Sequence, residues 1–142
     1  MPKTIAVAES CTGGLLGSLL TDTPGASKYF LGGVIAYQNL VKQILLGVPS
    51  HILRKHGAVS KETAIRMAIG VQKKFKVRVG VAITGIAGPA GGTKEKPVGL
   101  VYIALVSGQK KKCERSLFSG NRSAIRKRAA KTAYAWAKKE IF

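Results

Sequence analysis

The clearest predicted strand is residues 77–83, where bulky and smaller residues alternate. Val77, Val79, Val81 and Ile83 are the bulky members of this alternation. A period of two is typical of a β-strand, because successive side chains point to opposite faces. Four further short stretches, bounded by glycine, proline or polar residues, also have the length of strands. We therefore expect strands at residues 4–8, 33–37, 77–83, 99–106 and 111–118.

Helical spacing appears between these strands. Ala64, Ala68 and Phe75 belong to an apolar stripe with a period near 3.6, which begins after Ser60. The polar residues placed to cap the first turn of a helix are Asn39, Ser60 and Asn121. The stretch that holds His51 and His56 looks like a loop. The expected helices cover residues 14–20, 40–45, 61–75 and 122–138.

The order of these elements predicts the fold class. Helices between the early strands imply right-handed crossovers and a parallel core. The turn at Ser107-Gly108 joins the last two strands into a hairpin, which adds one antiparallel strand. We expect a single α/β domain over residues 1–142, a three-layer α/β/α sandwich with a mixed, mostly parallel five-stranded sheet.

The composition fits a folded domain, with 142 residues of which 46% are hydrophobic. No apolar run approaches the roughly 20 residues needed to cross a bilayer, and the N-terminus lacks a signal-peptide stretch. We expect a soluble, cytoplasmic protein without a membrane partner. Cys11 and Cys113 are too few for a disulfide framework, and His51 and His56 stand beside no cysteine or carboxylate cluster. We therefore expect no metal.

The charge is unusual. Twenty-four Lys and Arg oppose six Asp and Glu, which gives a net charge of +18, and half of this surplus lies in residues 110–142. Such a surface attracts anions, and non-specific affinity for nucleic acid follows from it. The basic residues of the last helix avoid its apolar stripe, so we interpret them as a solvated face. They are Arg126, Lys127, Arg128, Lys131 and Lys138.

Polar residues gather where the early strands end. Ser10 follows the first strand, Tyr37 ends the second, Lys42 lies one turn into the next helix, and Thr84 follows the third. In an open parallel sheet, ligands bind beyond the carboxyl ends of the strands. We therefore expect these four residues to meet at one edge.

A serine that attacks an amide needs a base, and Lys42 and Glu9 are the nearby candidates. Lysine acts as a base only where burial or neighbouring cations lower its pKa. The backbone N–H groups at Gly13 and Gly14 could hold an oxyanion or a phosphate. A purely structural role is the alternative for each of these residues. The turn from Ser10 to Gly14 could only cap the following helix, and the Lys42 side chain could be solvated. Cys11 is more often a small core residue than a nucleophile.

Five linked motifs resemble the CinA C-terminal domain family in order and spacing, together with a closing sequence, and they cover nearly the whole chain. The motifs are Glu9-Ser10-Cys11-Thr12-Gly13-Gly14, Gly33-x-x-x-Tyr37-x-Asn39-x-x-Lys42, Gly57-Ala58-Val59-Ser60, Thr84-Gly85-Ile86-Ala87-Gly88-Pro89-x-Gly91-Gly92 and Lys96-Pro97-Val98-Gly99. The closing sequence is Gly120-Asn121-Arg122-x-x-x-Arg126.

The resemblance implies a nicotinamide-nucleotide amidase of pyridine nucleotide salvage, which converts nicotinamide mononucleotide to nicotinic acid mononucleotide and ammonia. It implies an α/β/α fold and a homo-oligomer, either a dimer or a larger assembly. It places the nucleophile on Ser10 and its base on Lys42, with Tyr37 and Thr84 nearby. The residues expected to bind the substrate are Thr12, Gly13, Gly14, Gly85, Gly88 and Arg122, with Arg122 as a phosphate ligand.

This chain departs from the family pattern at Asn121, where the family more often has an aspartate that could orient Arg122. It also starts at the first strand, without the amphipathic helix and the larger N-terminal domain that family members often carry. Only the amidase half can therefore be inferred, and an oligomer face could differ.

The expected mechanism is acyl transfer from Ser10 to water, with Lys42 carrying the proton and with no metal or redox cofactor. Two alternatives stay open. The chain could be a basic nucleic-acid-binding protein, although aromatic residues are only 6% and no recognised motif is present. It could also be a non-catalytic nucleotide-binding domain.

Overall fold

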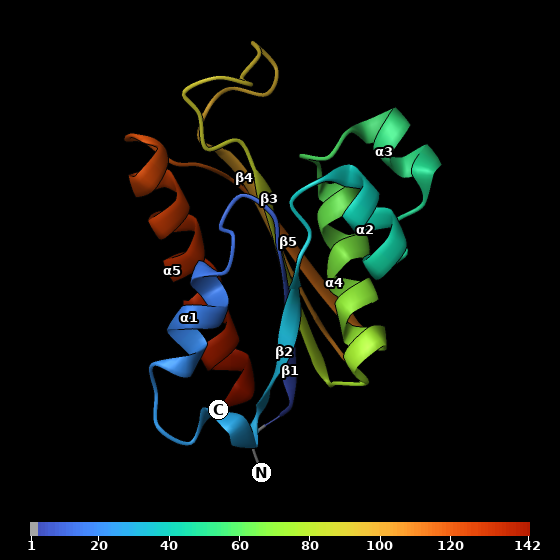
Figure 1. Ribbon diagram of the computed structural model, residues 1–142, viewed down its shortest axis with the longest axis vertical. Helices are drawn as coiled ribbons and strands as arrows, with labels where there is room; N and C mark the ends of the chain where they lie inside the picture. The colour runs from blue at the N-terminus through green and yellow to red at the C-terminus, as the bar shows by residue number, and fades with distance from the viewer. Residues whose placement is uncertain (1–2) are drawn as a thin grey trace.

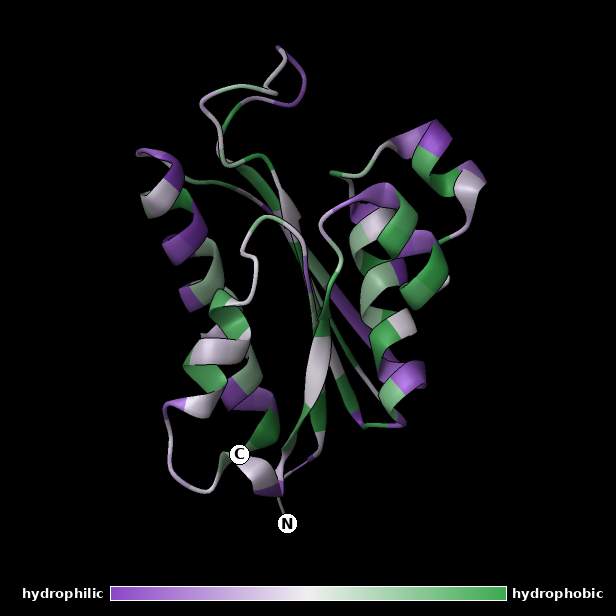
Figure 2. Ribbon diagram, in the orientation of Figure 1, coloured by the Kyte–Doolittle hydropathy of each residue, from purple (hydrophilic) through white to green (hydrophobic). Residues whose placement is uncertain are grey.

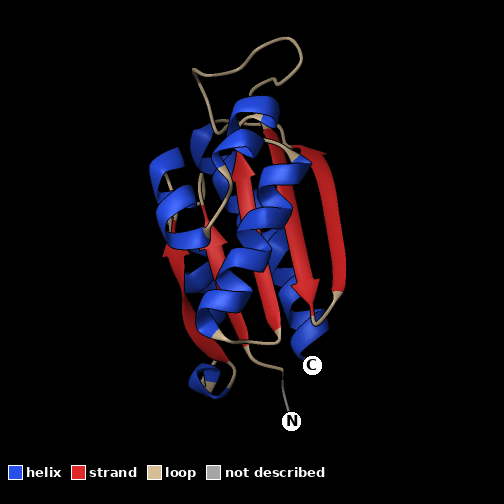
Figure 3. Cartoon of the chain, turned by 90° about the vertical axis from the view of Figure 1, so that its right-hand side faces the viewer, coloured by secondary structure: helices blue, strands red, loops and turns tan. Residues whose placement is uncertain are grey.

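The computed structural model describes residues 3–142. Over this range one five-stranded sheet lies between two layers of helices (Figure 1, and from the side in Figure 3), which confirms the expected α/β/α sandwich. The strands are β1 (Ile5–Glu9), β2 (Phe30–Ile35), β3 (Val79–Gly85), β4 (Leu100–Ser107) and β5 (Lys110–Leu117). The helices are α1 (Leu15–Thr21), the 3-10 turn η1 (Ala26–Lys28), α2 (Asn39–Leu46), α3 (Ser50–His56), α4 (Lys61–Phe75) and α5 (Arg122–Ile141).

The strand order is β2-β1-β3-β4-β5. The pairs β1–β2 and β1–β3 are parallel, whereas β3–β4 and β4–β5 are antiparallel. Strand β4 alone therefore runs against the others, so the mixed, mostly parallel sheet is confirmed. The expected hairpin between β4 and β5 is confirmed, and it turns at Gly108-Gln109, one residue later than expected, because Ser107 still pairs with Lys110.

The alternation in β3 places bulky residues on one face of the sheet and small residues on the other. Val79, Val81 and Ile83 enter the core beneath α1 and α5, while Ala82 enters the core beneath α4. A Cβ on Gly80 would lie 2.3 Å from the carbonyl oxygen of Ala68, so α4 packs directly on the backbone of β3. Figure 2 shows the corresponding hydrophobic colour on the helix faces that meet the sheet.

Three local predictions were wrong. The stretch with His51 and His56 is the helix α3 and not a loop; the helix begins after Pro49, and its one buried residue, Leu53, packs into the core on the side of α4. Strand β2 ends at Ile35, two residues before Tyr37, because its neighbour β1 ends at Glu9, which pairs with Ile35.

The third wrong prediction was the cap before α2. The extended residue before the helix is Gln38, which makes no capping hydrogen bond, so Asn39 already lies in the first turn. The caps at Ser60 and Asn121 are confirmed, since each side chain accepts a backbone N–H, from Thr63 and Ala124 respectively. No helix within residues 3–142 is both long and apolar enough to cross a membrane.

Candidate active site

Strands β1 and β2 end at the same level of the sheet, and β3 continues two residues further, to Gly85. Glu9, the last residue of β1, pairs with Ile35 on one side and with Ile83 on the other. The segments that follow therefore converge on one pocket of about 270 Å³. Its lining includes Ser10, Tyr37, Lys42 and Thr84, as expected, together with Cys11, Asn39, Ala58, Val59, Gly85, Ile86, Ala87, Gly88, Ala90, Gly91 and Arg122.

Lys42 is buried at the base of this pocket, with 1% of its surface exposed. Its Nζ lies 2.9 Å from the carbonyl oxygen of Ala36, 3.3 Å from that of Tyr37 and 3.2 Å from Ser10 Oγ. Burial lowers the pKa of Lys42 from 10.5 to about 8, because the ammonium is removed from water.

The three contacts of Lys42 match the three N–H donors of its ammonium form, with Nζ donating to the carbonyl oxygens of Ala36 and Tyr37 and to Ser10 Oγ. Loss of one proton allows the contact with Ser10 to reverse. A neutral amine has two N–H donors, which the carbonyl groups of Ala36 and Tyr37 can accept. The remaining lone pair can then accept the hydroxyl proton of Ser10. The arrangement can therefore activate the serine as a nucleophile without a histidine.

Cys11 is next to Ser10, but its side chain stays a neutral thiol and is therefore a poor nucleophile. Its side chain is buried, and burial raises the pKa of the thiol to about 11. The thiolate, not the thiol, is the reactive species, so Cys11 is unreactive near neutral pH. The geometry favours Ser10 over its neighbour.

Glu9 was the second candidate base, and the structure gives its carboxylate another role. Glu9 is buried, and Oε1 accepts hydrogen bonds from the Thr12 hydroxyl at 2.6 Å and the Leu16 amide at 2.9 Å. Oε2 accepts from the Gly17 amide at 2.9 Å. A carboxylate on the first amides of α1 also interacts favourably with the helix dipole. Glu9 thus holds α1 against β1 and does not line the pocket.

The turn over Thr12, Gly13 and Gly14 was expected to bind substrate, and the structure does not bring it into the pocket. The Thr12 hydroxyl is used by Glu9, and the Gly13 amide donates to the carbonyl of Ser10 at 3.1 Å. These residues shape the nucleophile turn, because the left-handed backbone at Gly13, with φ of 56°, reverses the chain there.

Arg126 was interpreted as part of a solvated face, and this was wrong. Its Nε donates to the carbonyl of Cys11 at 2.8 Å, and its Nη2 donates to that of Thr12 at 3.1 Å. One guanidinium therefore ties α5 to the Cys11–Thr12 and Thr12–Gly13 peptide groups, just beyond the nucleophile. The sequence did carry a signal for this contact. Arg126 follows Arg122 by four residues, which puts both arginines on one face of the helix.

Arg122 crosses the mouth of the pocket. Its Nη1 donates to the carbonyl of Gly88 at 2.6 Å, and its Nη2 donates to the Tyr37 hydroxyl at 2.9 Å. Arg122 and Tyr37 are both exposed, so their contact sits at the rim where a ligand would enter. The arrangement leaves a cationic group facing an otherwise uncharged opening.

The loop between β3 and β4 forms one wall of the pocket and extends beyond the helices at the top of Figure 1. Gly85 and Gly88 line the pocket, as expected. The Thr84 hydroxyl donates to the carbonyl of Ala58 at 2.8 Å, and Lys96 Nζ donates to that of His56 at 2.6 Å. The end of β3 is thus joined to the segment after α3, and the loop is joined to the last residue of α3.

A metal centre has no ligand set in the part of the chain that the structure describes. Among residues 3–142, no three His, Cys, Asp or Glu side chains come together in a way that could hold a metal ion. The site offers a buried amine, a hydroxyl and backbone amides, which is a donor set for acyl transfer.

Comparison with known proteins places this geometry in a family. Over 123 residues the chain is 54% identical to a putative competence-damage inducible protein of Desulforudis audaxviator, covering 87% of this chain and 30% of that protein. Over 103 residues it is 65% identical to a CinA-like protein of Prochlorococcus marinus, covering 72% of this chain and 24% of that protein. The chain therefore spans about a third or less of the length of these relatives.

Solved structures agree with this assignment. The competence/damage inducible protein CihA from Agrobacterium tumefaciens superposes with a TM-score of 0.94 at 37% identity, covering 97% of this chain and 85% of that one. The competence damage-inducible protein A from Klebsiella pneumoniae gives a TM-score of 0.92 at 28% identity, covering 97% and 86%. Residues 2–141 match the CinA C-terminal domain. The chain belongs to the CinA C-terminal domain family.

Proposed function

We propose that the chain is an amidohydrolase that hydrolyses the carboxamide of nicotinamide mononucleotide, giving nicotinic acid mononucleotide and ammonia. The observation that carries the proposal is the buried Lys42, whose Nζ lies 3.2 Å from Ser10 Oγ in a pocket with Arg122 at its rim. The resemblance to the family supplies the substrate. The site supports this substrate because Ser10 and Lys42 can attack the amide and the Arg122 guanidinium can bind the phosphate.

In the first step, neutral Lys42 takes the hydroxyl proton of Ser10 as Oγ bonds to the carboxamide carbon. The positively charged pyridinium ring makes that carbon more electrophilic. Lys42 then gives the proton to the departing nitrogen, so that ammonia leaves and an ester on Ser10 remains. Water attacks this ester with Lys42 again as base, which frees the acid and restores Ser10.

The oxyanion formed on the carboxamide oxygen needs N–H donors. We assign this role to the backbone amide of Cys11, the pocket residue directly after the nucleophile. The amide of Gly13 is excluded because it already donates to the Ser10 carbonyl. The substrate phosphate is assigned to Arg122, since this guanidinium stands at the pocket rim.

We further propose that the protein is cytoplasmic and forms a homo-oligomer.

The test is ammonia release from nicotinamide mononucleotide in a buffer with a chelator, compared with nicotinamide riboside, which lacks the phosphate. We expect turnover of the nucleotide, formation of nicotinic acid mononucleotide, and a higher KM for the riboside. Binding of the nucleotide without ammonia release would instead identify a non-catalytic nucleotide-binding domain.

A further inference from the structure

A basic groove lies between β5 and the second half of α5, away from the Ser10 pocket. Helix α5 packs on β3 and β4 and leaves β5, the edge strand, largely exposed. Two adjoining hollows of about 480 and 490 Å³ result, and they share Leu105, Lys112 and Glu140. The remaining lining residues are Ser107, Lys110, Lys111, Ala135, Trp136 and Lys139.

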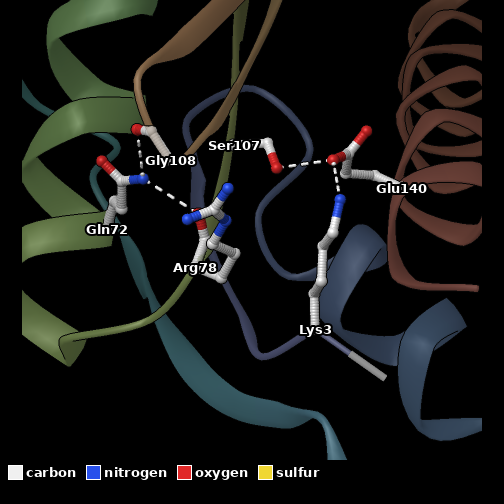
Figure 4. Close-up of polar contacts among 6 residues, drawn as sticks. All are labelled: Lys3, Gln72, Arg78, Ser107, Gly108 and Glu140. Atoms are coloured by element: carbon white, nitrogen blue, oxygen red, sulfur yellow. Dashed lines mark hydrogen bonds and ion pairs between the residues drawn. The ribbon is translucent and has the colours of Figure 1, made fainter. Parts of the chain in front are cut away.

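The single acid in this groove is already neutralised. Glu140 accepts a hydrogen bond from Lys3 Nζ at 2.7 Å and another from Ser107 Oγ at 2.5 Å (Figure 4). Hydrogen bonds from Lys3 and Ser107 hold the pKa of Glu140 below its usual range, so it stays a partnered carboxylate. Lys110 and Lys139 form no ion pair with any other residue in the range 3–142.

The groove also contains an aromatic surface. Trp136 is partly buried against the core, and Lys112 Nζ lies 3.7 Å from the centre of its ring. The ammonium of Lys112 thus covers one face of the indole ring and keeps its charge within the groove. If the ammonium moves to an external anion, the ring face becomes available for stacking.

We propose that this groove binds single-stranded nucleic acid, with phosphates on Lys110, Lys112 and Lys139 and a base stacked on Trp136. A positive groove that contains an aromatic side chain is the combination that binds single strands without sequence preference. Lys110 and Lys112 are two residues apart on one strand, so their Cα atoms are about 6.7 Å apart. Lys110 and Lys112 thus present two cations on the same side of β5.

An acidic membrane is the other polyanion to consider, and the distribution of apolar side chains argues against it. Interfacial binding requires apolar side chains beside the basic ones. Leu117, at the far end of β5, and Phe142, which follows α5 and packs edge-on against Tyr29, are exposed but do not line the groove. Five of the other large exposed apolar residues belong to β2 and α2, and β2 is the opposite edge strand of the sheet. They are Leu31, Ile35, Leu40, Ile44 and Leu45.

The chain has a single tryptophan, so its fluorescence reports on this groove alone. The experiment titrates an oligothymidylate of about 16 nucleotides into the protein at several salt concentrations. We expect saturable quenching of Trp136. The Lys110→Gln/Lys112→Gln variant should lower the slope of log K against log salt by about 1.4, since each phosphate contact on a single strand contributes about 0.7.

The matched control is Lys73→Gln/Lys74→Gln on α4, which changes the net charge equally at two exposed lysines. We expect its salt slope to stay within experimental error of the parent. Equal loss of slope in both variants would mean that net charge alone attracts the oligonucleotide and would overturn the proposal. Binding without a change in Trp136 fluorescence, or quenching only by phosphatidylserine vesicles, would also overturn it.

Discussion

Arg126 Nε donates a 2.8 Å hydrogen bond to the carbonyl oxygen of Cys11, a residue 115 positions earlier in the chain. The second hydrogen bond from this guanidinium, to the Thr12 carbonyl, makes the contact bidentate. The last helix therefore holds the Cys11–Thr12 and Thr12–Gly13 peptide groups, which directly follow the peptide group whose Cys11 N–H is assigned to the oxyanion. Arg126 is a positioning residue, since it does not line the pocket.

Replacing Arg126 with methionine should lower kcat about 10- to 100-fold with little change in KM, because small misplacement of a reacting group slows the chemical step. The turn should also loosen, so in a Cys113→Ala background the Cys11 thiol should react faster with a thiol reagent. A rise in KM at unchanged kcat would show instead that Arg126 binds the substrate.

The activity should depend on the ionisation of Lys42. Its pKa is about 8, so about one chain in ten has a neutral amine at pH 7. Below pH 8, kcat/KM should rise about ten-fold per pH unit, and it should level off above about pH 9. Lys42→Met should lose at least about 100-fold in rate. A flat profile from pH 6 to 9 would remove Lys42 as the base.

The same ionisation affects stability. The pKa of Lys42 is lower in the folded chain than the ordinary 10.5, so burial of the charged form opposes folding. This cost is fully present below about pH 8 and is relieved as the pH rises towards 10.5. We expect the free energy of unfolding of the parent to increase relative to Lys42→Met between pH 8 and 10, measured in urea at each pH. A constant difference would contradict the lowered pKa.

Arg122→Ala should raise KM for nicotinamide mononucleotide with a smaller effect on kcat. The guanidinium is assigned to the phosphate, and a charge-assisted hydrogen bond contributes more than a neutral one. Arg66→Ala, at an exposed position on α4, is the matched control and should leave KM unchanged. If Arg122→Ala raises KM equally for the riboside, the residue holds the pocket wall at Gly88 and not the phosphate.

The sheet could be predicted from the sequence because its strands carry strong local patterns. The alternation in β3 and the chain order were sufficient to place Ser10, Tyr37, Lys42 and Thr84 at one edge. Parallel strands end together, so residues far apart in the chain meet without any specific pairing signal. The 3.2 Å approach of Lys42 to Ser10 depends on this topology.

The roles of Glu9 and Arg126 could not be predicted in the same way. Both depend on where a side chain points, and the residue pattern leaves this open. Glu9 turns towards the first amides of α1, while Arg126 leaves the basic face of α5 to reach two backbone carbonyls. Short helices are similarly hard to detect, and α3 was missed because only Leu53 is buried within it.

The most direct test of the Ser10–Lys42 account compares ammonia release by the parent, Ser10→Ala and Cys11→Ala at pH 8.5 with a chelator present. All three proteins should show the same circular dichroism spectrum. We expect the parent to release ammonia from nicotinamide mononucleotide, Cys11→Ala to keep most of that rate, and Ser10→Ala to release none above background. Activity retained by folded Ser10→Ala and lost in folded Cys11→Ala would contradict the account.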